Sequence, residues 1–138
     1  MNFHPWRWLR AQPHLEVVWQ PQPAGRLAAT DGHRVIYMDP RQSQPQRRCA
    51  ITHEQIHVER AHVGGCSRRE EHAVRAETAR RLIELPALIS AYRWTRHLRE
   101  LAEELWVTTE VLCDRLDHLT RTERAELMRV QRETERGA

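Results

Sequence analysis

The sequence predicts an α+β fold in which a small antiparallel sheet precedes a helical core and a C-terminal helical bundle. Six of the seven prolines lie within residues 1–46, where the apolar segments are short. After Pro45 the main interruptions are Gly64-Gly65 and Pro86, and the segments between them have the apolar spacing of amphipathic helices. A chain of 138 residues is long enough to bury a core and suits one compact domain, with room for a small appended subdomain.

The sheet is predicted from three short segments in the N-terminal third. Residues 15–19 are apolar and rich in β-formers, and residues 25–30 supply a second candidate strand. Asp31-Gly32 is a strong hairpin signal before Val35-Ile36-Tyr37. We therefore expect these strands to pair in an antiparallel way.

The remaining elements are predicted helices. The turn at residues 64–67 separates a first helix from a second one over residues 67–85, which Pro86 ends or kinks. Further helices are expected over residues 93–105, 109–119 and 120–132, the last of which opens on a capping box from Thr120 to Glu123.

Composition excludes several classes of function. The net charge is +3, and the 22 basic residues, all arginine, are dispersed among 19 acids, so charge alone does not call for nucleic acid. No apolar run reaches the ~20 residues of a membrane span or resembles a signal peptide, so we expect a cytoplasmic protein that does not bind membranes. Cys49, Cys66 and Cys113 are expected to be free thiols because they are odd in number and widely spaced.

The first helix contains His53-Glu54-Gln55-Ile56-His57. At 100° per residue the two imidazoles project about 40° apart, and Glu54 lies roughly 60° from His57. A zinc peptidase needs two neutral imidazoles on one metal, a third ligand, an open position for water and a carboxylate as general base. The motif predicts Zn²⁺ as cofactor, His53 and His57 as ligands and Glu54 as the catalytic base. The alternative is an ordinary amphipathic helix with surface histidines.

The rest of this helix divides into faces. We expect a solvated face opposite the motif, because polar residues gather there. Cys49 lies one turn before His53, where a buried thiol is favoured over a soft metal ligand. The polar residues of the expected solvated face are Arg48, Thr52, Gln55 and Glu59.

A third ligand is expected on the next helix, across the Gly64-Gly65 turn. Glu71 is the acid that falls in the middle of that helix's apolar face, where an unpaired carboxylate would be costly. We choose Glu71 as the metal ligand, with Glu70 and then His72 as alternatives. An ion pair between Glu71 and Arg75 would also account for a carboxylate at this position. The apolar face comprises Val74, Thr78, Ala79, Leu82, Ile83 and Leu85.

Residues 49–60, around the motif, and residues 70–83 together resemble a short ImmA/IrrE-type metallopeptidase of actinobacterial or phage origin. The resemblance implies a zincin-like, zinc-dependent peptidase able to cleave or inactivate a helix-turn-helix repressor. It also implies that His53, His57 and Glu71 bind zinc and that Glu54 activates water. We expect residues 1–91 to form this zincin-like domain. A non-catalytic zinc-binding regulator that binds a repressor or toxin is the alternative function.

Residues 92–138 are expected to form a helix-turn-helix-like helical subdomain. Its second helix carries Glu110, Asp114 and Asp117 against Arg115 alone, which disfavours contact with DNA phosphates. Packing within the protein or recognition of a protein partner is expected instead. Trp94 and Trp106 are expected to anchor this subdomain. Three further side chains are candidates for a second group that stabilises the transition state, and the spacing does not select among them: Tyr37, His62 and His97.

Overall fold

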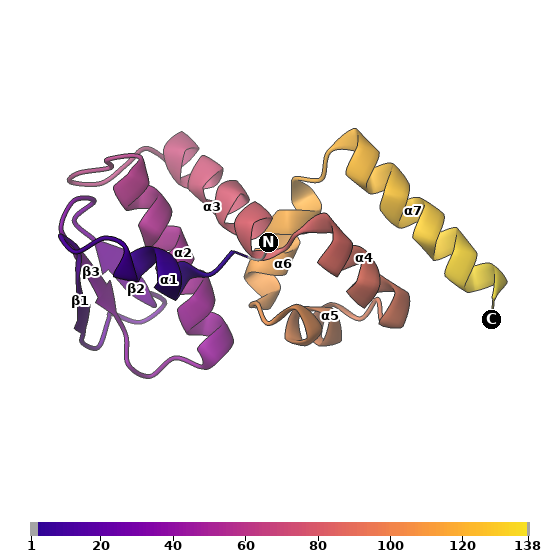
Figure 1. Ribbon diagram of the computed structural model, residues 1–138, viewed down its shortest axis with the longest axis horizontal. Coiled ribbons are helices and arrows are strands. Elements are labelled where there is room, and N and C mark those ends of the chain that lie inside the picture. Colours follow the sequence, from indigo (N-terminus) through magenta and orange to yellow (C-terminus); the bar gives the residue numbers. More distant parts are fainter. Residues whose placement is uncertain (1–2, 138) are drawn as a thin grey trace.

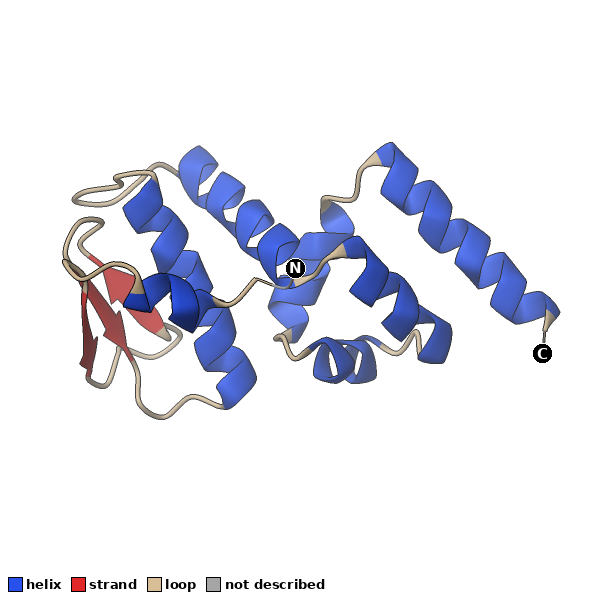
Figure 2. Ribbon diagram, in the orientation of Figure 1, coloured by secondary structure: helices blue, strands red, loops and turns tan. Residues whose placement is uncertain are grey.

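The computed structural model describes residues 3–137 and is α+β, as expected from the sequence (Figure 1). A short helix, α1 (Pro5–Arg10), precedes three strands, β1 (Glu16–Trp19), β2 (Ala28–Thr30) and β3 (Val35–Met38). The strands gather at one end of the molecule, and the C-terminal helix lies at the other (Figure 2). The helices after the sheet are α2 (Gln44–Glu59), α3 (Arg68–Leu82), α4 (Leu85–Trp94), α5 (Leu98–Leu105), α6 (Thr109–Asp117) and α7 (Arg121–Arg136).

The sheet is mixed, which corrects the expectation of an antiparallel sheet. The strand order is β1-β3-β2, with β3 parallel to β1 and antiparallel to β2. The β2–β3 hairpin forms where Asp31-Gly32 predicts it, because the Asp31 carboxylate accepts the backbone N–H groups of His33, Arg34 and Val35 at 2.8–3.0 Å. Strand β3 lies between the other two strands and therefore also pairs with β1, in the parallel direction. Its side chains Ile36 and Met38 are completely buried.

Helix α2 packs against the sheet, α1 and α3. It begins with a capping box between Ser43 and Gln46. The expected solvated face is wrong for Thr52 and Gln55, which are both fully buried. Thr52 avoids an unpaired hydroxyl by donating to the Arg48 carbonyl at 2.8 Å. Burial on several sides fixes the orientation of the histidine face within the molecule.

Pro86 starts a helix rather than ending one. Helix α3 stops at Leu82, and Pro86 lies in the first turn of α4, where a missing N–H costs nothing. The expected helix over residues 93–105 is also wrong: α4 ends at Trp94, and α5 begins only at Leu98. Neither α1 nor most of α4 was expected from the sequence.

The C-terminal helices share a core with the helices that precede them. Trp94 and Trp106 do not anchor this region as expected, because they are 74% and 58% exposed. Among the described residues, none of the helices combines the length and apolar character that a bilayer span requires. The shared core consists of Cys49, Leu82, Ile83, Leu88, Ala91, Leu101, Ala102, Val107, Leu112 and Leu127.

Candidate metal centre

A cleft of about 750 Å³ opens between β2, α2, α3 and the start of α6. Backbone and side chains of residues 25–30 form one wall, and His53, Glu54 and His57 of α2 lie along another. Glu71 of α3 also lines the cleft. His53, Glu54, His57 and Glu71 therefore face a space large enough for a peptide segment.

His53, His57 and Glu71 converge on one point in this cleft. The two Nε2 atoms are 3.2 Å apart, and Glu71 reaches both, with Oε1 2.8 Å from His53 Nε2 and Oε2 3.0 Å from His57 Nε2. Donor atoms bonded at 2.0–2.2 Å to a tetrahedral zinc ion lie roughly 3.3 Å from one another. Two imidazoles and one carboxylate at this spacing are a donor set that fits zinc.

The turn between α2 and α3 brings these residues together. The two helices lie side by side (Figure 1), and the chain reverses through Ala61, Gly64 and Gly65, which all have positive φ angles. Glu71 lies one turn before the buried Val74, as the apolar face predicts. Local backbone geometry thus places a carboxylate of α3 against the histidines of α2.

The alternatives for the third ligand position have different partners in the structure. Arg75 donates two hydrogen bonds of 3.1 Å to Asp114 of α6 rather than pairing with Glu71. Glu70 caps α3 by accepting the Ser67 N–H at 2.8 Å. His72 is exposed, and its ring packs edge-on against that of His118 at 5.4 Å.

The surroundings of Glu54 and Glu71 shift the pKa values of these two carboxyls in opposite directions. Glu54 is 8% exposed, and burial raises its pKa to about 7, with the neighbouring Glu71 charge acting in the same direction. The hydrogen bond from His53 instead lowers the pKa of Glu71 to about 2. One carboxylate thus stays ionised as a ligand must, while the other can take up and release a proton near neutral pH.

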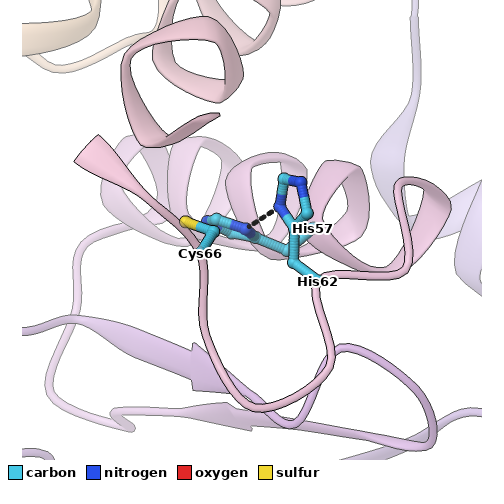
Figure 3. A group of neighbouring side chains, drawn as sticks. All are labelled: His57, His62 and Cys66. Atoms are coloured by element: carbon cyan, nitrogen blue, oxygen red, sulfur yellow. Dashed lines mark hydrogen bonds between the residues drawn. The ribbon is translucent and has the colours of Figure 1, made fainter. Parts of the chain in front are cut away.

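A chain of hydrogen bonds runs outward from His57. Its Nδ1 lies 2.9 Å from Nδ1 of His62 (Figure 3). Nε2 of His62 in turn lies 3.1 Å from Oε2 of Glu70. If His57 Nε2 faces a metal, Nδ1 carries the proton and donates to His62, whose Nε2–H then points at Glu70. This arrangement fixes the tautomer and the ring orientation of a ligating imidazole.

Sequence reasoning missed this role for His62, which it named only as a possible transition-state group. Tyr37 and His97, the other two candidates, are not among the described residues that line the cleft. Cys49 is buried and lines the cleft as well. The sequence also gave no sign that Cys66, in the turn, would lie 3.7 Å from Glu71 Oε2.

The family model described as the IrrE N-terminal-like domain, Peptidase_M78, matches residues 20–117. The chain belongs to this family. The expected ImmA/IrrE-type resemblance is thereby confirmed, and this Peptidase_M78 chain is a member of a metallopeptidase family. The matched range includes strands β2 and β3, both helices of the candidate centre and α6. No curated protein and no solved structure matches this Peptidase_M78 chain.

Proposed function

We propose that the protein is a zinc-dependent endopeptidase whose substrate is a protein, specifically a helix-turn-helix transcriptional repressor. The observation that carries the proposal is the convergence of His53, His57 and Glu71 in an open cleft. Membership of a zinc metallopeptidase family supports it further. His53, His57 and Glu71 are the proposed metal ligands, and Glu54 is the proposed catalytic residue.

When bound, zinc would supply a Lewis acid that activates water and polarises the substrate carbonyl. Glu54 accepts the proton of the attacking water and returns it to the leaving amine. Its raised pKa suits both steps, since the same carboxyl must be basic first and acidic later. Burial of Glu54 beside the ligand positions keeps bulk water from competing for that proton.

The edge of the sheet supports a peptide substrate. In the order β1-β3-β2, strand β2 pairs with β3 on one side, and Ala28, Ala29 and Thr30 line the cleft. An extended peptide can add to such an edge through backbone hydrogen bonds, which hold it regardless of its sequence. A peptide held there lies across the cleft from Glu54.

Two units are proposed within the chain: residues 1–91 as the zincin-like metallopeptidase domain and residues 92–138 as a helix-turn-helix-like subdomain. A protein partner is favoured over DNA for the second unit. Helix α6 carries Glu110, Asp114 and Asp117, and its one arginine, Arg115, is 2% exposed and bonded to Glu123. The helix therefore offers no accessible cation to a phosphate.

The test compares the zinc-loaded wild-type protein with Glu54→Gln, using the helix-turn-helix repressors encoded next to its gene as substrates. We expect both proteins to bind zinc, because the substitution leaves the three ligands intact. Cleavage should fall by about 10²–10⁴-fold in the variant, the usual contribution of a general base. Glu110→Gln, at another cleft residue, is the matched control and should cleave normally.

The alternative function is a non-catalytic zinc-binding regulator that binds a repressor or toxin. If wild-type protein holds zinc and binds one of these repressors but leaves every one intact, the endopeptidase proposal is wrong and this alternative stands.

A further inference from the structure

Cys66 lies at the rim of the candidate metal centre. It follows Gly64-Gly65 in the turn between α2 and α3, is exposed and lines the cleft. Its Sγ is 3.7 Å from Glu71 Oε2, the same oxygen that faces His57 Nε2 at 3.0 Å. Figure 3 shows the sulfur beside the ring of His57.

Donor atoms of His57, His62 and Cys66 lie within 4.8 Å of one another, as do those of His53, His57 and Glu71. The two groups share His57. A separate second ion between His62 and Cys66 is disfavoured, because both ring nitrogens of His62 already have partners, His57 at 2.9 Å and Glu70 at 3.1 Å. The Cys66 thiol is therefore assigned to the group of His53, His57 and Glu71 rather than to a separate metal site.

The distance between Cys66 and Glu71 suits two ligands of one zinc ion. With a Zn–S bond of about 2.3 Å and a Zn–O bond of about 2.0–2.2 Å, a tetrahedral angle sets sulfur and oxygen roughly 3.5 Å apart. The observed 3.7 Å to Glu71 is close to this spacing. Cys66 shares no group of donor atoms within 4.8 Å with His53, so the turn must also move the sulfur toward His53. Gly64 and Gly65, which precede Cys66, both have positive φ angles, and a Cβ built on either would meet no atom within 4 Å, so no other element packs against the turn at those two positions.

We propose that Cys66 is a reversible fourth ligand that closes this metal centre most of the time, and so slows cleavage without abolishing it. The inference rests on the metal site of the proposed function. Closed zinc sites have four protein ligands, whereas catalytic ones keep a position for water. Binding of the Cys66 thiolate fills the position beside Glu54 that the attacking water needs, and withdrawal of the turn reopens it.

The experiment uses the full chain loaded with Co²⁺, whose visible and near-ultraviolet spectrum reports its ligands. Wild type should show thiolate-to-cobalt charge-transfer absorption. Cobalt should also slow alkylation of one thiol by iodoacetamide about tenfold or more, which corresponds to closure of at least about nine in ten centres. Cys66→Ser should lose both signals while still binding cobalt through His53, His57 and Glu71.

Cys49→Ser and Cys113→Ser are the matched controls and should keep both signals. Stoichiometric cobalt binding by wild type without the charge-transfer absorption overturns the inference and leaves the metal site standing. Persistence of the absorption in Cys66→Ser overturns it in the same way. Failure of wild type to bind cobalt overturns the metal site, and this inference with it.

Discussion

Replacement of His62 by Phe should weaken zinc binding without touching any proposed ligand. The change removes the acceptor 2.9 Å from His57 Nδ1 and the link to Glu70, while the aromatic ring keeps most of the buried volume. Loss of the partner that orients a ligating histidine typically weakens metal affinity by 10–100-fold, or about 1.4–2.7 kcal/mol. We expect an effect within that range, because His62 contacts His57, one of the three proposed ligands.

The zinc affinity is measured by competition with a chromophoric chelator at fixed pH, and folding of the metal-free proteins is compared by thermal unfolding. His72→Phe is the matched control, since His72 is exposed on α3 and packs against His118. His62→Gln keeps a hydrogen-bonding side chain and should recover part of the affinity. Zinc affinity of His62→Phe equal to that of wild type, in a folded protein, would refute the role of His62 in orienting His57.

Three further predictions concern the scaffold. Gly32→Ala should lower the free energy of unfolding, measured in urea, by about 1–3 kcal/mol, because φ is +76° at Gly32 and a Cβ there would lie 2.3 Å from the His62 carbonyl oxygen. Gly25 is also at positive φ but in open space, so Gly25→Ala should lower the free energy of unfolding by less. Arg115→Ala should cost about 3–5 kcal/mol, because it removes the buried partner of Glu123 and leaves the Ile83 carbonyl without the donor that Arg115 supplies at 2.7 Å. Arg124→Ala, at an exposed residue, should change stability by less than about 0.5 kcal/mol. The Arg115 guanidinium lowers the pKa of Glu123 from 4.5 to about 2, so the pair stabilises the fold above pH 4.5 and this contribution is lost as the pH falls toward 2. Glu123→Gln should therefore reduce the pH dependence of the unfolding free energy between pH 4.5 and 2. An unchanged pH dependence in this variant would contradict the pairing.

The parts of the site that lie on one helix could be predicted from the sequence. His53, Glu54 and His57 share a face because helical periodicity fixes their directions. Glu71 could be singled out in a similar way, since the apolar positions of α3 define a buried face and a carboxylate there needs a partner. Its proposed role as a ligand is still a prediction, although the structure brings it against both imidazoles.

The features that depend on tertiary packing were not predictable in the same way. The positions of His62 and Cys66 follow from the path of a turn through three residues of positive φ, which no periodicity describes. The parallel β1–β3 pair depends on where β3 inserts, and hairpin signals report only the β2–β3 connection. Thr52 and Gln55 were expected to face solvent because their polarity says nothing of the elements that cover them.

The most direct test of the central claim is the zinc content of purified protein after loading and dialysis, compared among wild type, Glu71→Ala and Glu70→Ala. The account predicts about one zinc ion per chain in wild type, a clear loss in Glu71→Ala and near-normal retention in Glu70→Ala, because Glu71 contacts both imidazoles and Glu70 contacts His62. Full zinc retention in Glu71→Ala together with its loss in Glu70→Ala would contradict the proposed ligand set.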